Sequence, residues 1–469
     1  MNPIPEDPKR EFSLSRRDFI RTSMAAGTGL LMTGPAILHG QASSSVTRDL
    51  KVAIIGTGSQ GRVLLEACAG IPNIQFVAVC DMWDYSLRYG QGILRKRGFK
   101  PNPYEDYQEM LSKESDLDAV IIATPDFMHA EQTNACLRAG INVYCEKMMS
   151  NSIDGARSMV QTARETGKLL QVGHQRRSNP RYLHAKHRML GDAKLLGRIT
   201  HINGQWNRAV GEDLGWPNRH EIKPDRLARF GYENMHQFRN WRWFKQYSGG
   251  PISDLGAHQI DIYNWFLGTP PKSIMASGGL DYYKDRDWYD NAMVVYEYDT
   301  AQGPVRAFYQ VLTTTSAGGG YFEYFMGTEG SLRISENPAY TAAFREANAP
   351  EWESHVREGI VRMAAPKTAA APTLKPWEKP RPGQAAANAT PTVVDVRETA
   401  ALSEWELPVQ LDKAIHQPHL ENFFDAIRNG TPLNSPGEVG LETLATVLKV
   451  NEAIAAEKKL RFDPMDFRI

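Results

Sequence analysis

The chain has 469 residues, with 54 Lys and Arg against 54 Asp and Glu, so its formal net charge is zero. This balance, with 42% hydrophobic and 23% charged residues, is typical of a folded soluble protein and gives no support to a nucleic-acid partner or a disordered chain. Single cores rarely grow beyond roughly 250–300 residues, so we expect two domains.

Residues 1–42 have the three-part pattern of a signal peptide. Arg16 and Arg17 in SRRDFI precede a weakly apolar stretch, and small residues follow at 40–42. Paired arginines before such a stretch are typical of the twin-arginine route. We therefore predict periplasmic export by the twin-arginine machinery, with an uncleaved membrane anchor as the alternative. Proteins exported by this route fold first, so a dinucleotide could be carried out inside the protein.

A glycine-rich turn follows the first predicted strand. KVAIIG is typical of a strand, GTGSQG of a turn and RVLLEACAGI of a helix. In this order, a GxGxxG match indicates a dinucleotide site, because the turn lets the backbone approach the pyrophosphate and the helix N-terminus offers N–H groups to it. The predicted cofactor-binding residues of the turn are Gly56, Thr57, Gly58, Ser59, Gln60 and Gly61.

The second predicted strand, IQFVAVC, ends on Asp81, about 20 residues beyond the last glycine of the turn. An acid at this place accepts hydrogen bonds from the adenosine ribose hydroxyls and repels a 2′-phosphate. We therefore expect NAD as the cofactor, and NADP less so.

Strands and helices continue to alternate up to about residue 175. Strands that are apolar on both faces, such as LDAVIIATP and INVYCEK, predict a parallel sheet when helices separate them. Ligands of such sheets bind beyond the carboxyl ends of the strands. At this edge we add Thr124, Pro125, His129, Glu146, Lys147 and Gln175 to the predicted cofactor site.

A second domain is predicted over residues 176–469. AMVVYEYD, RAFYQVLTT and FEYFMGTEGSLRIS predict successive antiparallel strands, and an Ala- and Pro-rich segment at about 364–395 predicts an extended or flexible insert. Asp254 and His258 are four residues apart in a predicted helix, so they share one face. The residues alone leave structural alternatives open, a helix cap for Asp254 and a satisfied interior histidine for His258.

Other polar and aromatic residues of the second domain are less informative. Trp241, Trp243 and Phe244 lie among cations and could stack on a sugar, but we interpret them as core or interface. Asp261 is either a second substrate contact or a solvated carboxylate. The four cysteines have no CxxC spacing, so no metal site is expected.

As a set, these motifs resemble the glucose-fructose oxidoreductase/inositol dehydrogenase family, also written Gfo/Idh/MocA. The resemblance rests on GTGSQG with Asp81, ATPDFMH, the EK pair, QVGHQRR and GGPISDLGAHQIDIYNW, and it runs from about residue 50 to the end, except for an insert near 340–405. It implies a Rossmann domain over 50–175 and a C-terminal α/β domain with an open, mainly antiparallel sheet. This sheet is often an oligomer interface in the family, so a homo-oligomer is expected. One departure is Met148, which stands where the family has a proline after the lysine.

The resemblance further implies that Lys147 is the signature lysine and that Asp254 and His258 are the catalytic aspartate and histidine. We expect His258 to accept the hydroxyl proton, Lys147 to polarise the substrate oxygen, and Asp254 to orient the substrate or relay the proton. The predicted function is an exported NAD-dependent oxidoreductase that acts on CH–OH groups of a sugar, polyol or glycoside, with tightly bound cofactor. Two alternatives stay open: an NAD-dependent glycoside hydrolase working by transient oxidation of the sugar, and a non-catalytic sugar-binding protein.

Overall fold

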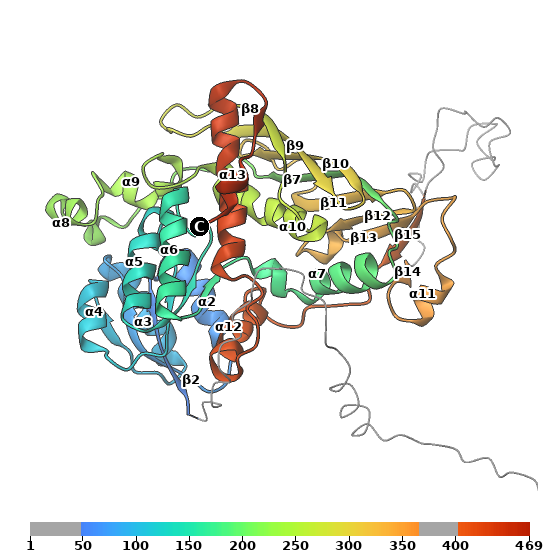
Figure 1. The fold of residues 1–469 in the computed structure, drawn as a ribbon. Helices are drawn as coiled ribbons and strands as arrows, with labels where there is room; N and C mark the ends of the chain where they lie inside the picture. The colour runs from blue at the N-terminus through green and yellow to red at the C-terminus, as the bar shows by residue number, and fades with distance from the viewer. Residues whose placement is uncertain (1–47, 365–401) are drawn as a thin grey trace, which may run out of the picture. The chain divides into compact units, whose positions relative to one another are not determined.

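The structure is a computed structural model that describes residues 48–364 and 402–469 (Figure 1). The predicted signal peptide at 1–42 lies outside the described residues, as does the predicted insert beyond residue 364. Within the described ranges, none of the helices has the length and apolar character that a membrane crossing requires.

A six-stranded sheet forms the first domain, in the order β3-β2-β1-β4-β5-β6 with every pairing parallel. This is the order of a doubly wound dinucleotide-binding fold, which confirms the predicted class. Its strands are β1 (Leu50–Ile55), β2 (Ile74–Cys80), β3 (Asn102–Tyr104), β4 (Ala119–Ile122), β5 (Asn142–Cys145) and β6 (Leu170–Val172). Its helices are α2 (Ser59–Cys68), α3 (Asp84–Lys96), α4 (Tyr107–Lys113), α5 (Asp126–Arg138) and α6 (Ile153–Thr166).

The first sheet is buried on both faces because its strands are apolar throughout. Val52 and Ile54 of β1 pack in one core, and Ala53 and Ile55 pack in the core on the other side. Alternate side chains of a strand point to opposite faces, so both faces require an apolar cover. The late helix α12 (Gln417–Asn429) supplies part of this cover, since its Phe423 lies in the same core as Val52.

A ten-stranded sheet forms the second domain, in the order β14-β15-β13-β12-β11-β7-β10-β9-β8-β16. Its pairings are antiparallel except β7 with β10, so the predicted mainly antiparallel sheet is confirmed. The strands are β7 (Ile199–Asn207), β8 (Ser273–Gly279), β9 (Asn291–Thr300), β10 (Gly303–Leu312), β11 (Tyr321–Gly327), β12 (Gly330–Ile334), β13 (Ala342–Arg345), β14 (Arg362–Met363), β15 (Ser403–Glu406) and β16 (Leu460–Arg461).

Two details of the predicted strand sequence were wrong. FEYFMGTEGSLRIS forms two strands, β11 and β12, because the chain turns at Thr328 and Glu329 and the two strands pair with each other. Strand β11 also pairs with β7 and not with β10, since the earlier strand β7 lies between them.

Helices cover one face of the second sheet and leave the other partly exposed. Helix α13 lies between α6 and α10, and it also contacts β8 (Figure 1). On the opposite face, Met293 is 46% and Phe308 is 37% exposed. The remaining helices are α7 (Pro180–His184), α8 (Pro224–Arg229), α9 (Met235–Arg239), α10 (Ala257–Leu267), α11 (Glu353–Arg357) and α13 (Gly437–Ala456).

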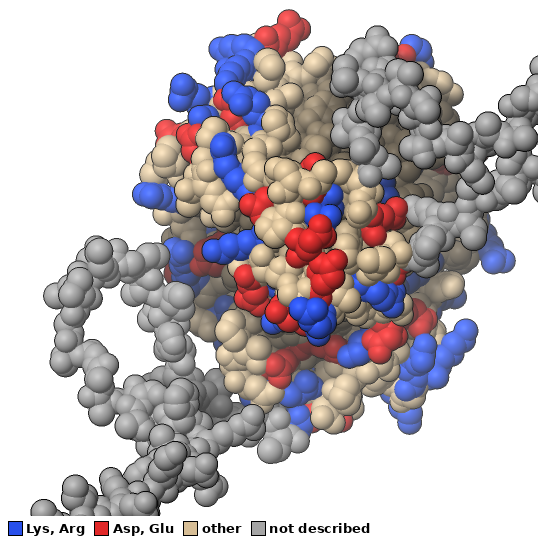
Figure 2. Space-filling view, turned by 90° about the vertical axis from the view of Figure 1, so that its right-hand side faces the viewer, with Lys and Arg blue, Asp and Glu red and all other residues tan. Residues whose placement is uncertain are grey.

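Short irregular helical turns connect the longer elements. Turns of π-helix span Ala185–Asp192 and Ile252–Gly256. Single 3₁₀ turns lie at Gln175–Ser178, Asn218–His220, Trp241–Trp243, Pro338–Tyr340 and Pro464–Phe467. On the face drawn in Figure 2, acidic and basic side chains are interspersed.

Candidate active site

A cavity of about 650 Å³ lies at the carboxyl ends of the strands of the first sheet, and the second domain forms its other wall. The first domain contributes Gly58, Asp81, Thr124, Asp126, Glu146 and Lys147. The second domain contributes Trp206, Arg208, Trp243, Asp254, His258 and Arg286. The cavity therefore brings the predicted cofactor edge and the predicted catalytic residues together.

The three glycines of the turn have different surroundings. Gly56 has a φ of +92°, and a Cβ there would lie 2.7 Å from the carbonyl carbon of Ala123. A Cβ on Gly61 would lie 2.0 Å from the backbone oxygen of Gly56. A Cβ on Gly58 would meet no atom within 4 Å, and no side chain caps helix α2 there. Space beside an uncapped helix N-terminus fits the pyrophosphate of a dinucleotide.

Asp81 connects the glycine turn to the end of β2. Its Oδ2 accepts hydrogen bonds from the Thr57 N–H (2.7 Å) and the Thr57 hydroxyl (3.0 Å), and its Oδ1 accepts one from the Trp83 N–H (2.8 Å). Burial raises the pKa of Asp81, and these hydrogen bonds oppose that shift. A carboxylate has about four acceptor positions, so one remains for a ribose hydroxyl.

His129 lies behind the predicted cofactor edge and is not among the residues that line the cavity. Its Nδ1 is 2.7 Å from the Met148 carbonyl oxygen and its Nε2 is 2.7 Å from the Thr124 carbonyl oxygen. Burial lowers its pKa to about 4. A neutral imidazole has one N–H, so His129 donates to only one of these two carbonyl oxygens, and it lies between the two loops without lining the cavity.

The cavity is also lined by other predicted cofactor residues, namely Ser59, Gln60, Thr124, Pro125, Glu146 and Gln175, but not by Thr57 or Gly61. Gln60 Nε2 donates to Glu146 Oε1 (3.2 Å), and Gln175 Nε2 donates to Glu336 Oε1 (3.0 Å). Thr124 and Pro125 also line the cavity, and Pro125 precedes the first residue of α5. Two further residues at this edge come from distant parts of the chain, and sequence reasoning missed them. One is Glu336, which accepts the hydrogen bond from Gln175. The other is His416, whose Nε2 lies 3.0 Å from Gln60 Nε2.

Lys147 reaches across the cavity to the second domain. The Lys147–Met148 peptide bond is cis. The Lys147 Nζ donates to the backbone oxygen of Asp254 and lies 3.9 Å from its Oδ1. The segment is helical as predicted, but Asp254 lies in the π turn Ile252–Gly256 and His258 lies in α10, which follows it directly. Both side chains nevertheless line the same cavity, and π turns are frequent at functional sites.

Asp254 is surrounded by positive charge. Arg242 Nε donates to its Oδ1 at 2.8 Å, and Arg208 Nη1 lies 3.8 Å from its Oδ2. Burial by itself would raise the pKa of Asp254, but Arg242, Lys147 and Arg208 outweigh it and hold the pKa well below its usual range. Asp254 is therefore ionised at neutral pH, with three cations around one carboxylate.

For His258, burial and the neighbouring positive charges shift the pKa in the same direction. Burial, and then the charges of Lys147 and Arg176, lower its pKa well below the usual value, so the imidazole is neutral at neutral pH. Its Nδ1 is buried and has no hydrogen-bond partner among the described residues. The alternative of an interior histidine satisfied by the backbone is thus not met. A neutral imidazole at the wall of a cavity is suited to accept a proton.

Three further residues differ from their predicted surroundings. Trp241 and Phe244 pack against a hydrophobic cluster, as interpreted, but Trp241 and Trp243 also line the cavity. Asp261 pairs with Arg177 Nη2 at 2.8 Å in the interior, so it is neither a solvated carboxylate nor a cavity-lining residue. Asp126 is buried at the cavity wall, and burial raises its pKa to about 7. Its place directly after Thr124 and Pro125 was the available sequence signal.

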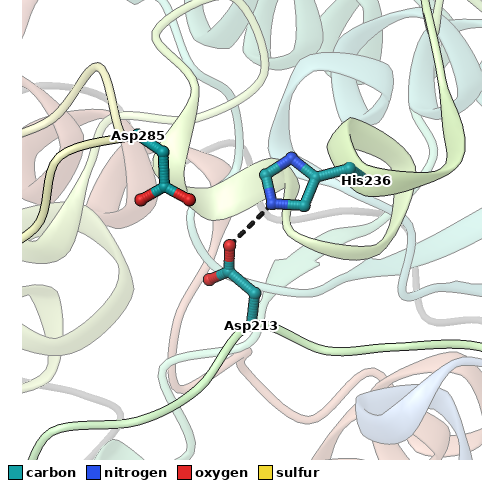
Figure 3. A group of neighbouring side chains, drawn as sticks. All are labelled: Asp213, His236 and Asp285. Atoms are coloured by element: carbon teal, nitrogen blue, oxygen red, sulfur yellow. Dashed lines mark hydrogen bonds and ion pairs between the residues drawn. The ribbon is translucent and has the colours of Figure 1, made fainter.

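One group of three side chains in the described part of the chain has metal-ligand spacing, namely Asp213, His236 and Asp285 (Figure 3). His236 Nε2 lies 2.6 Å from Asp213 Oδ2. Asp213 Oδ1 accepts a hydrogen bond from Arg286, which lines the cavity. The group is therefore linked to the cavity wall through Arg286.

Two family models match the chain. Residues 50–174 match the model described as "Oxidoreductase family, NAD-binding Rossmann fold", and residues 184–333 match that described as "GFO/IDH/MocA C-terminal domain". Together they cover most of the described residues of both domains.

Curated relatives and solved structures agree with these models. The scyllo-inositol 2-dehydrogenase (NAD(+)) of Bacillus subtilis (strain 168) is 26% identical over 291 residues, which cover 61% of this chain and 74% of that protein. A glycosyl hydrolase family 109 protein of Stenotrophomonas maltophilia (strain K279a) is 32% identical over 164 residues, which cover 33% and 34%. The structure of levoglucosan dehydrogenase in complex with NADH has a TM-score of 0.62 at 16% identity, covering 88% of this chain and 99% of that one, and shows the fold alone.

The matches to the curated relatives cover only part of each relative's length. The chain spans 34% to 64% of the length of the first four curated relatives that it matches.

Proposed function

Because the chain belongs to the Gfo/Idh/MocA family of oxidoreductases, with an NAD-binding Rossmann fold, we propose that it transfers hydride between a CH–OH group of a sugar, polyol or glycoside and tightly bound NAD. One observation carries the proposal: the glycine turn, Lys147, Asp254 and His258 line a single cavity. The open space at Gly58 and the remaining acceptor position of Asp81 fit the dinucleotide. The chemistry supplied by bound NAD is hydride acceptance at the nicotinamide ring.

His258 is the proposed base. Its imidazole is neutral and the residue lines the cavity, so the ring can take the proton of a substrate hydroxyl there. The nearby charges of Lys147 and Arg176 disfavour the imidazolium form. The proton is therefore held only briefly on His258 before it passes to solvent.

Lys147 is the proposed polariser of the substrate oxygen. One ammonium hydrogen is used by the backbone oxygen of Asp254, and an ammonium group has two more. Donation from these to the substrate oxygen stabilises the alkoxide that develops as hydride leaves. Asp254 holds Lys147 and Arg242 in place and, because it stays ionised, orients the substrate through its remaining acceptor capacity.

Two parts of the proposal concern the cell and the assembly. The pattern at residues 1–42 supports export by the twin-arginine route into the periplasm, with NAD loaded before export. The partly exposed apolar residues Met293 and Phe308 support a homo-oligomer formed through the uncovered face of the second sheet.

A second candidate function is the NAD-dependent hydrolysis of glycosides through transient oxidation of the sugar. The similarity to a glycosyl hydrolase family 109 protein over 164 residues favours keeping it. It would use the same cofactor and the same base, but NAD would be restored within each turnover.

The test is to denature the purified full-length protein, identify the released cofactor, and follow absorbance at 340 nm during incubation with polyols, sugars and nitrophenyl glycosides. A lasting change in NAD redox state with one alcohol supports the oxidoreductase. Release of nitrophenol without a lasting redox change supports the hydrolase. If no dinucleotide is bound or taken up, both enzymatic proposals fail and the sugar-binding alternative gains support.

A further inference from the structure

Arg286 is a buried arginine at the cavity wall that the proposed hydride transfer does not use. Its side chain is only 3% exposed, and it lines the cavity. Its guanidinium carbon lies 3.3 Å from the centre of the Tyr283 ring and 3.9 Å from that of Trp243. The Tyr283 hydroxyl is itself held, since it donates to the Thr313 backbone oxygen at 3.1 Å. Two rings against one guanidinium fix the plane in which its N–H groups point.

Most of the Arg286 donors have no acceptor. Nη2 donates to Asp213 Oδ1 (3.1 Å) and reaches the Gly211 backbone oxygen at 3.5 Å. Nε is buried without a partner, and Nη1 hydrogen-bonds none of the described residues. A guanidinium has five donors in a rigid fork, and leaving such donors unpaired in a buried place costs free energy. Nε has no accessible surface, so Nη1 is the donor for which a ligand in the cavity can supply an acceptor.

Asp213, one of the three residues drawn in Figure 3, holds Arg286 from a position outside the cavity lining. Asp213 is not a lining residue, and its two oxygens are divided between Arg286 and His236. One carboxylate oxygen therefore holds one end of the guanidinium. The opposite end remains available to the cavity.

Three cations surround Asp254 in a cavity that is also lined by the carboxylates of Asp81, Glu105, Asp126, Glu146, Glu212 and Glu336. Arg242 and Lys147 already pair with Asp254, so Arg208 is a third cation beside one carboxylate. The Arg208 side chain is 49% exposed and has no hydrogen bond to a described residue. An anionic group entering the cavity would meet attraction from both Arg208 and Arg286.

From these observations we infer that Arg286 binds a carboxylate of the substrate, so that the protein favours acidic sugars, such as uronic acids and their glycosides, over the matching neutral sugars. The inference rests on the proposed function for the sugar nature of the ligand. Nη1 can donate charge-assisted hydrogen bonds to a carboxylate, and these are roughly twice as strong as hydrogen bonds to a neutral hydroxyl.

The test compares matched pairs, methyl β-D-glucuronide with methyl β-D-glucoside and methyl β-D-galacturonide with methyl β-D-galactoside, by calorimetric binding to the NAD-loaded full-length protein. Arg286→Gln removes the fork, and Arg188→Gln, an exposed position outside the cavity lining, is the control. In the unaltered protein, one uronide should bind at least tenfold more tightly than its neutral partner. Arg286→Gln should abolish this preference, whereas Arg188→Gln should preserve it.

Other outcomes overturn the inference. Equal binding of acidic and neutral partners, or a preference that survives Arg286→Gln, would do so. Binding of Zn²⁺ that Asp285→Asn abolishes, without any uronide preference, would instead assign the Asp213, His236 and Asp285 group to a metal. Arg286→Lys keeps the charge without the guanidinium, so it should retain only part of the uronide preference. Such partial retention would show that the loss of preference in Arg286→Gln is not caused by misfolding.

The absorbance at 340 nm separates this inference from the proposed function. Uronide binding that depends on Arg286, without any change in NAD redox state for either sugar class, keeps the carboxylate site and removes the oxidoreductase proposal. Reduction of NAD by a neutral sugar without a uronide preference keeps the oxidoreductase proposal and removes the carboxylate site.

Discussion

Gly58→Ala is expected to remove NAD and leave the fold almost intact. A Cβ at this position would meet no protein atom within 4 Å, and φ is −62°, so alanine introduces neither a clash nor backbone strain. Gly58 is the N-cap of α2, where alanine is less favourable than glycine by about 1 kcal/mol or less. The new methyl group would instead occupy the space in which the pyrophosphate approaches the backbone. We expect at least a tenfold loss of NAD affinity, about 1.4 kcal/mol.

Two further glycine-to-alanine variants are the controls for Gly58→Ala. Gly61→Ala would place Cβ 2.0 Å from the Gly56 oxygen, so it should lose about 3 kcal/mol of stability as well as the cofactor. Gly92→Ala also enters open space, but in the middle of α3 and away from the cavity, so it should keep NAD and gain up to about 1 kcal/mol.

The assays are urea unfolding of the cofactor-free proteins and the molar ratio of NAD to purified protein. If Gly58→Ala retains NAD at the ratio of the unaltered protein, or loses as much stability as Gly61→Ala, the assignment of this turn to the pyrophosphate is refuted.

Three other changes have defined outcomes. His258→Gln should lower the single-turnover rate of NAD reduction by about 10²–10⁴-fold and leave the NAD content unchanged, since it removes the base and not the glycine turn. Burial lowers the pKa of His174 to about 4, against about 6.5 unfolded, so the unfolded state binds more protons between these values and stability falls with falling pH. His174→Gln should therefore reduce the loss of stability between pH 7 and pH 5, measured by urea unfolding, by about 2 kcal/mol. Phe308→Glu, on the uncovered sheet face, should convert an oligomer to monomers in light scattering without lowering monomer stability; an unchanged mass would exclude this interface.

Much of the site could be predicted because it follows short-range patterns. The glycine turn is defined by a strand before it and a helix after it, and Lys147 ends a buried strand. In a parallel sheet, strand ends share one edge, so these residues had to meet. Asp254 and His258 are close in sequence and remain on one wall even though a π turn separates them.

The rest depends on contacts between distant segments. His416 meets Gln60 across 356 residues, and no local pattern indicates that pairing. Arg286 stacks on Trp243, which comes from the 3₁₀ turn Trp241–Trp243 earlier in the chain. Asp261 resembles a site residue by spacing, but its burial with Arg177 depends on how α10 packs.

The charge of Lys147 connects the protonation states of the two catalytic partners. Arg242 and then Lys147 lower the pKa of Asp254, and burial and then Lys147 lower the pKa of His258. One cation therefore contributes to both an ionised carboxylate and a neutral imidazole. If this coupling holds, Lys147→Met raises the pKa of His258, and because the base form is then lost at higher pH, the acid limb of the rate of NAD reduction moves to higher pH. An acid limb that stays in place while the rate falls would show that Lys147 acts on the substrate oxygen alone.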